Sequence, residues 1–209
     1  MKKYEWRKKE QKIYLPKTNP VIVDIPEYKY LTINGEGNPN NDFFSEHIAV
    51  LYSISYTLKM GLKKNHNQPN DYTDYTVYPL EGNWDLKSNS KKNANNTINK
   101  NDLTYKLMIR QPDFIDATLF EESLEIVKRK KPHELLTKVN FEKITEGKCI
   151  QMLHVGSFDD EPKTFKVMEE FAKKENLLRV SKAHKEIYIS DFRKVTEEKL
   201  KTVLRFKVI

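Results

Sequence analysis

The chain has 209 residues, of which 38% are hydrophobic and 32% are charged. This composition is typical of one globular domain or two small joined ones, and it excludes a fibrous repeat and wholesale disorder. No apolar run approaches the roughly 18 residues that a membrane span needs, and the charged start lacks the apolar core of a signal peptide. We therefore expect a cytoplasmic protein with no membrane partner. A single cysteine, Cys149, excludes an internal disulfide.

The formal charge of +7 comes from 37 Lys and Arg against 30 Asp and Glu. Much of the basic excess lies in 1–12 and 87–101, while Lys and Glu are interleaved elsewhere, which is typical of solvated helix faces. The sequence has neither the two closely spaced helical patterns of a helix-turn-helix nor zinc-finger spacing. We therefore expect no direct binding of nucleic acid.

The first half of the chain opens with a lead-in and continues with alternating strand and helix patterns. Residues 1–25 end in a stretch with Pro16 and Pro20, and we expect them to be extended because proline disfavours helix in the residue before it. Apolar spacing then predicts a strand, a helix and two strands, at 28–33, 42–60, 75–81 and 103–109. The helix is expected to stop at Gly61. Lys, Asn and Ser fill 87–101, which we expect to be a mobile loop.

The second half repeats this order after a linking helix at 116–131, which Pro132 ends. Its predicted strand, helix and two strands are at 149–155, 163–177, 185–189 and 203–208. Gly35 stands nine residues before Phe44, and Gly156 stands nine residues before Phe165. The two strand-to-helix turns therefore match in length, which indicates an internal duplication.

We expect an α+β fold made of two fused strand-helix-strand-strand units with pseudo-twofold symmetry. The first unit covers 26–115, the linking helix 116–132 and the second unit 138–209. Each unit has a sheet with one bare face, so pairing the units buries both faces and forms a ligand cleft between them.

Three long blocks of sequence resemble the bacterial GyrI-like small-molecule-binding domain. In chain order they are 105–114 (YKLMIRQPDF), 152–162 (MLHVGSFDDEP) and 184–191 (HKEIYISD). The turn Glu81-Gly82-Asn83-Trp84 and the lead-in Leu15-Pro16 also fit this family. The resemblance covers nearly the whole chain, and the family is built on a duplicated strand-helix-strand-strand unit.

The resemblance implies a stand-alone protein that binds or sequesters bulky, hydrophobic, cationic or planar small molecules, including drugs. Related domains are the effector-binding parts of AraC-type and multidrug-responsive transcription regulators. Two alternatives remain open at this point. One is a hydrolase that opens the cyclopropane rings of DNA-alkylating natural products, and the other is a protein-binding gyrase inhibitor or transcriptional co-regulator.

Glu186 is the main candidate for the site. It alternates with Tyr188 on one face of a predicted strand, and this face lies either in solvent or in a cleft. In a cleft, the Glu186 carboxylate pairs with a cationic ligand or, in an enzyme, activates water while Tyr188 or Tyr105 donates a proton. The resemblance extends the ligand-binding set with six more residues, Tyr78, Glu81, Trp84, Tyr105, Met108 and His154.

We expect no metal and no cofactor. His154 and His184 have no metal ligands at characteristic spacing beside them, so structural hydrogen bonds are the simpler interpretation of both. Cys149 lies in a predicted strand as a small apolar group. Asp159, Asp160 and Glu161 precede a helix, where acidic side chains complement the helix dipole.

Overall fold

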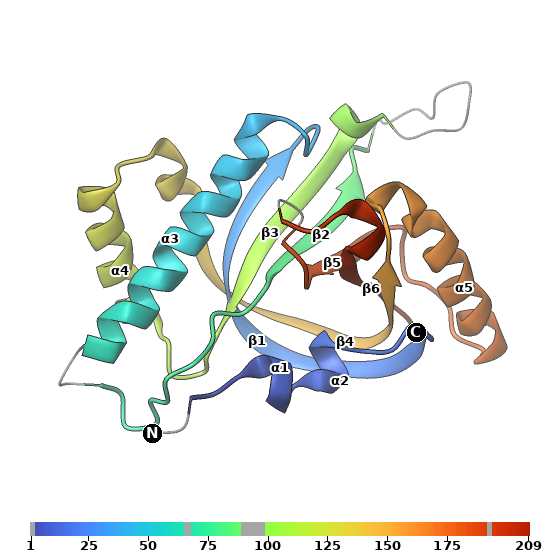
Figure 1. Ribbon diagram of the computed structural model, residues 1–209, viewed down its shortest axis with the longest axis horizontal. Helices are drawn as coiled ribbons and strands as arrows, with labels where there is room; N and C mark the ends of the chain where they lie inside the picture. The colour runs from blue at the N-terminus through green and yellow to red at the C-terminus, as the bar shows by residue number, and fades with distance from the viewer. Residues whose placement is uncertain (1–2, 65–67, 89–98, 192–193) are drawn as a thin grey trace. The chain divides into compact units, whose positions relative to one another are not determined.

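The computed structural model describes residues 3–64, 68–88, 99–191 and 194–209 (Figure 1). They divide into two compact units that are discontinuous in sequence. The first unit consists of Met1–Glu5, Tyr28–Leu80 and Leu86–Ile144, and the second of Trp6–Glu27, Glu81–Asp85 and Thr145–Ile209. Most of the predicted mobile loop, 89–98, lies outside the described residues.

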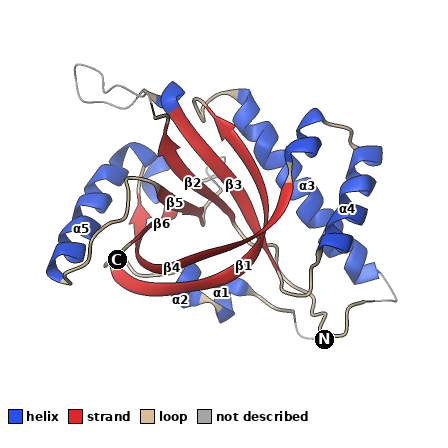
Figure 2. Cartoon of the chain, turned by 180° about the vertical axis from the view of Figure 1, so that it is seen from behind, coloured by secondary structure: helices blue, strands red, loops and turns tan. Residues whose placement is uncertain are grey.

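The fold is mixed α and β, with six strands and five α-helices among the described residues (Figure 2). The strands are β1 (Val21–Glu36), β2 (Leu80–Leu86), β3 (Leu103–Gln111), β4 (Asn140–Val155), β5 (His184–Tyr188) and β6 (Lys201–Lys207). The helices are α1 (Trp6–Lys9), α2 (Gln11–Tyr14), α3 (Asp42–Lys64), α4 (Ala117–Lys130) and α5 (Glu161–Lys174). Short 3₁₀ turns complete the described structure.

The strands are hydrogen-bonded in the order β1-β3-β2-β5-β6-β4, which closes as a barrel. The order strand, helix, strand, strand occurs twice along the chain, from β1 to β3 and from β4 to β6. In each set the first strand pairs antiparallel with the last, as in Leu31 opposite Ile109 and Leu153 opposite Val203. The element order thus agrees with the predicted one, while the duplication of units and the twofold symmetry stay predictions.

Helices α3 and α4 lie side by side in the first unit (Figures 1 and 2). Leu51, Ile54 and Leu58 recur at helical spacing on the buried face of α3. The predicted stop at Gly61 is wrong, because buried Leu62 continues this face and the helix runs to Lys64. A helix is present where the linking helix was predicted, but α4 belongs to the first unit.

The predicted strand at 75–81 is mostly wrong. Residues 76–79 are irregular, Tyr75 makes only an isolated bridge with Tyr4, and β2 begins at Leu80. Pro79 explains the late start, because proline has no N–H to donate to a strand ladder. The strand therefore lies further along the chain, where it includes Trp84.

The N-terminal lead-in of the second unit is not simply extended. It forms the short helices α1 and α2, each of which buries one aromatic side chain. Trp6 and Tyr14 are almost completely buried, and their ring centroids lie 5.2 Å apart. The burial of these rings stabilises helices that are too short to be stable in isolation.

Helix α5 packs against its own side of the second unit, beside β4 and β6 (Figures 1 and 2). Its Met168 and Ala172 form an apolar core with Ile150 and Leu204. The helix ends earlier than predicted, because Asn176 adopts the left-handed conformation with φ of 55°. Strand β5 carries buried residues on both of its faces, since Lys185, Glu186 and Ile187 are all buried.

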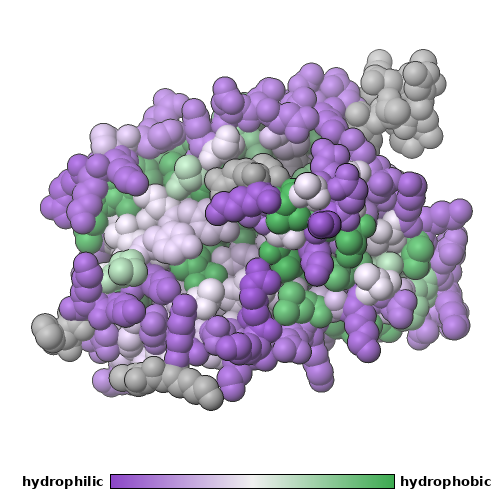
Figure 3. Space-filling view, in the orientation of Figure 1, coloured by the Kyte–Doolittle hydropathy of each residue, from purple (hydrophilic) through white to green (hydrophobic). Residues whose placement is uncertain are grey.

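Hydrophilic residues cover much of the face seen in Figure 3, with hydrophobic residues between them. Among the described residues, none of the helices combines the length and the apolar character needed to cross a membrane.

Candidate functional site

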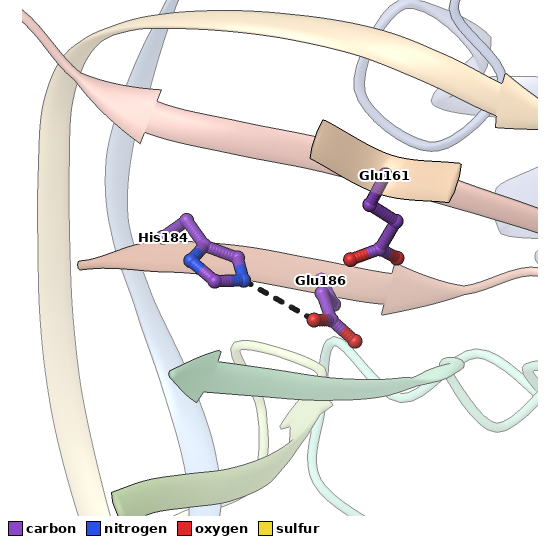
Figure 4. A group of neighbouring side chains, drawn as sticks. All are labelled: Glu161, His184 and Glu186. Carbon is purple, nitrogen blue, oxygen red and sulfur yellow. Dashed lines mark hydrogen bonds and ion pairs between the residues drawn. The ribbon is translucent and has the colours of Figure 1, made fainter. Parts of the chain in front are cut away.

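One face of β5 carries a chain of hydrogen bonds that ends on a carboxylate. Trp84 in β2 stands opposite His184 in the antiparallel register, so its ring lies on the same face as Glu186 and Tyr188. Trp84 Nε1 donates to the Tyr188 hydroxyl oxygen over 2.9 Å, and that hydroxyl donates to Glu186 Oε2 over 2.7 Å. His184 Nε2 lies 3.2 Å from Glu186 Oε1 (Figure 4). The sequence-predicted residues Trp84, Glu186 and Tyr188 are thus brought together.

This face of β5 is not solvated, since Glu186 is only 8% exposed. Aromatic rings surround it. The ring of Phe165 in α5 meets the His184 ring edge-on at 4.7 Å between centroids, and the Phe158 ring lies 6.1 Å from the Tyr188 ring. The more exposed parts are Phe158, at 38%, and the His184 side chain, at 22%.

Glu161 joins this site, although the sequence analysis placed it only at a helix start. It is the first residue of α5, and its carboxyl points toward Glu186 and His184 (Figure 4). One ligand atom each of Glu161, His184 and Glu186 lies within 4.8 Å of the other two. Glu161 is buried, and its Oε1 has no hydrogen-bond partner among the residues that the structure describes.

The environment favours the protonated form of two groups of the site. Burial raises the pKa of Glu161 well above its usual range, and the neighbouring carboxylates of Glu186 and Asp159 raise it further. Burial also raises the pKa of the Tyr188 hydroxyl, and the Glu186 carboxylate adds to the increase both by its charge and by accepting the hydroxyl proton. The site therefore combines a carboxylate, a neutral phenol and a second carboxyl group that is costly to ionise.

The opposite face of β5 holds a buried network of ion pairs. Lys185 Nζ lies 2.9 Å from Glu81 Oε2 and 2.8 Å from Glu146 Oε1. Arg205 of β6 is 3.1 Å from the same Glu146 oxygen. Glu81 was predicted to contact the ligand, but it lies in this network because it stands opposite Ile187, one residue out of phase with Glu186.

Further hydrogen bonds complete the network. Arg205 donates from Nε and one terminal nitrogen to Gln151 Oε1, over 3.0 and 2.8 Å. Gln151 Nε2 in turn donates to the Lys12 carbonyl over 2.6 Å. Burial alone raises the pKa of Glu146, but Lys185 and Arg205 outweigh it and hold the pKa below its usual range. This face is therefore a paired, structural set of charges.

His154 and Cys149 have structural surroundings. The two ring nitrogens of His154 lie 2.8 Å from Thr164 Oγ1 and 2.9 Å from the Ser157 carbonyl oxygen, so the ring ties β4 to the start of α5. These contacts correspond to structural hydrogen bonding. Burial raises the pKa of the Cys149 thiol to about 11, which keeps it protonated and unreactive.

The other predicted residues, Tyr78, Tyr105 and Met108, belong to the first unit. The Arg110 guanidinium carbon lies 4.7 Å from the Tyr78 ring centroid and 3.3 Å from the Tyr28 ring centroid, so a cation of the chain itself already contacts Tyr78. Burial raises the pKa of Tyr105 to about 12, and Met108 is fully buried.

Three solved structures show what the chain is similar to. A conserved protein of Listeria innocua is 35% identical, with a TM-score of 0.88, over 99% of this chain and 100% of that one. A second Listeria innocua protein, described as a hydrolase, is 33% identical with a TM-score of 0.87 over the same shares. The C-terminal domain of EcmrR shares the fold at 12% identity and a TM-score of 0.55, over 91% of this chain and 97% of that domain.

A search of curated proteins gave no match. The profile of the GyrI-like small-molecule-binding domain, in contrast, matches residues 18–209. This match includes every residue of the Glu186 site, which consists of Trp84, Phe158, Glu161, Phe165, His184, Glu186 and Tyr188. It also includes the residues of the ion-pair network around Lys185, apart from Lys12 of the lead-in. The chain therefore belongs to the family of GyrI-like small-molecule-binding domains.

Proposed function

We propose that the Glu186 site of the second unit binds a bulky hydrophobic small molecule that carries a positive charge or a planar group. The observation that carries the proposal is the Glu186 carboxylate, which lies among aromatic rings, accepts a hydrogen bond from Tyr188 and forms no ion pair with a lysine or arginine that the structure describes. Family membership supports the class of ligand.

The charge of the Glu186 carboxylate and its low exposure together favour a cationic ligand. A carboxylate of low exposure attracts a cation more strongly than one in water, because the surroundings screen the charge less. Aromatic faces add roughly 0.5–2 kcal/mol for each desolvated cation contact. Phe158 and the exposed part of His184 offer the ligand its first contacts, after which its charged group meets Glu186.

The test compares two probes of equal shape and opposite charge, tetraphenylphosphonium and tetraphenylborate, by isothermal titration calorimetry. We expect the phosphonium to bind the protein and the borate to bind far more weakly. Glu186→Gln should weaken phosphonium binding at least tenfold, which corresponds to about 1.4 kcal/mol. Glu170→Gln, an exposed change on α5, is the matched control. Equal affinity of the Glu186 variant and the parent would contradict the proposal.

Hydrolysis is a second candidate, and two observations favour it. Listeria innocua relatives that are 33% and 34% identical over the whole chain are described as hydrolases. The Tyr188 hydroxyl also donates to Glu186, so a base and an acid already exchange a hydrogen bond. This pair suits the opening of an activated cyclopropane conjugated to a carbonyl group.

In such a reaction Glu186 takes a proton from water while the water oxygen bonds to a ring carbon. The ring carbon–carbon bond breaks, and its electron pair moves to the conjugated carbonyl oxygen. Tyr188 then protonates this oxygen and recovers a proton from Glu186 through their hydrogen bond. The product is a ring-opened alcohol, and no other reactant is consumed.

Mass spectrometry of a cyclopropane-bearing alkylating agent incubated with the protein tests this candidate. We expect ring-opened product to form faster than in buffer, and Glu186→Gln to reduce the rate at least a hundredfold. The Glu170→Gln control should keep the parent rate. A rate no higher than that in buffer would exclude the hydrolase while leaving the binding proposal intact.

A further inference from the structure

We propose that Glu161, His184 and Glu186 bind one divalent transition-metal ion, with Zn²⁺ as the best match to these donors. The proposal goes beyond the proposed function, and because both involve Glu186, a bound metal ion and a cationic ligand exclude each other at this carboxylate. It also departs from the sequence-based expectation of no metal, because the three residues are brought together by the packing of α5 on β5 rather than by a short spacing.

The donor atoms of the three side chains lie close enough together to share one ion. The three side chains present one nitrogen and two oxygen atoms that lie within 4.8 Å of one another (Figure 4). Zinc binds such atoms at about 2.0–2.2 Å in a tetrahedron, which places two ligands roughly 3.3 Å apart. His184 Nε2 and Glu186 Oε1 are already 3.2 Å apart, so only the Glu161 carboxyl has to move closer.

The burial of Glu161 also favours a bound ion. Its side chain is more than nine-tenths buried and directed at the other two, yet its Oε1 has no hydrogen-bond partner among the described residues. No described lysine or arginine forms an ion pair with Glu161 or Glu186. A buried polar atom without a partner is rare in native proteins. A dication supplies the missing partner and balances both carboxylate charges.

The types of donor atom indicate which ion the site would bind. One imidazole nitrogen with two carboxylate oxygens suits zinc, whereas calcium and magnesium prefer oxygen ligands alone. Three protein ligands leave a fourth tetrahedral position for water or for a ligand atom. Glu186 Oε2 accepts the hydrogen bond of Tyr188, which orients the carboxylate so that Oε1 faces His184.

The experiment uses the untagged full chain after treatment with a chelator and dialysis, titrated with zinc chloride at pH 7 by calorimetry. We expect one ion per chain and a higher melting temperature when zinc is present. Glu161→Gln and His184→Gln should each weaken zinc binding at least tenfold and abolish this rise in melting temperature. Glu170→Gln on α5 and His133→Gln in the first unit are controls that should behave as the parent. Calcium chloride should give no binding.

Three results would overturn the proposal. The first is the absence of a one-to-one site. The second is an unchanged zinc affinity in Glu161→Gln and His184→Gln, which would place the ion elsewhere, for example beside His133 and Glu46. The third is equal binding of calcium and zinc. Circular dichroism establishes that each variant is folded, and the His184 variant decides the question if the Glu161 variant is not.

Discussion

The two faces of β5 differ in how their buried charges are paired. Residues of the two faces alternate along a strand of only five positions, so the two environments lie side by side. On one face Lys185 lies between two carboxylates, and Arg205 shares one of them, so each buried charge has an opposite charge within 3.1 Å. On the other face Glu161 and Glu186 lie close together with His184, and no lysine or arginine of the described residues forms an ion pair with them. The charges of the first face are fully paired with one another. The second face is stabilised when it takes up a proton, a metal ion or a cationic ligand.

This difference separates structure from function within one strand. Fully paired buried groups fix a fold, and perturbed or unsatisfied groups tend to mark functional sites. A lysine that looks functional from its burial is therefore structural here, while the glutamate next to it is the candidate for function. Four experiments test this difference between the two faces of β5.

The largest expected effect is that of Lys185→Met. The variant leaves Glu81 and Glu146 buried with one cation fewer, and removing one partner of a buried pair costs about 3–5 kcal/mol. Urea unfolding should show this loss in the free energy of unfolding. Lys182→Met is the control, because its side chain is 82% exposed and its ion pair with Glu169 should contribute at most about 1 kcal/mol. Similar losses in both variants would contradict the assigned structural role.

The second effect is an acid-induced loss of stability. The folded pKa of Glu146 is lowered, so its contribution is complete above the unfolded value of about 4.3 and is lost as the pH falls through the folded value. Urea midpoints measured from pH 6 to pH 3 should fall less steeply in Glu146→Gln than in the parent. Parallel curves for the two proteins would show that Glu146 is not responsible.

The third effect has the opposite sign. The folded pKa of Glu161 is raised, so folding the metal-free protein becomes less favourable as the pH rises above about 4.3. Glu161→Gln should therefore raise the melting temperature of the metal-free protein at pH 8 by a few degrees and leave it nearly unchanged at pH 4. A variant that melts lower than the parent at pH 8 would show that the carboxyl is stabilising.

The smallest effect is expected for Tyr188→Phe. The change removes the donor to Glu186 and the acceptor of Trp84 Nε1, and loss of such hydrogen bonds costs roughly 1–2 kcal/mol. Thermal unfolding gives this value, and binding of tetraphenylphosphonium shows whether the hydroxyl also positions the carboxylate.

The sequence predicts the elements whose signals are local. The amphipathic pattern of α3, the helix α4 that ends before Pro132 and the strands β5 and β6 are visible in apolar spacing. The shared face of Glu186 and Tyr188 follows from strand alternation alone. The prediction failed at β2 and at the lead-in, where a proline and two buried aromatic rings decide the outcome.

The rest of the site depends on contacts between distant parts of the chain. Glu161 and Glu186 stand 25 residues apart, and only the packing of α5 on the sheet brings their carboxyl groups together. Glu81 shows the same limit, because its role is set by a cross-strand register that no pattern within β2 reveals. A single sequence contains no local signal for either contact.

The network around Lys185 also has a consequence for how the protein is made. Its members come from five separate parts of the second unit, namely the lead-in, β2, β4, β5 and β6, and Glu146 is synthesised well before Arg205. Until β6 has left the ribosome, a nascent chain lacks Arg205, the second cation that pairs with Glu146, and burial of the Glu146 carboxylate is disfavoured. The second unit should therefore become stable late in synthesis and in one cooperative step, when β6 pairs with β4 and β5.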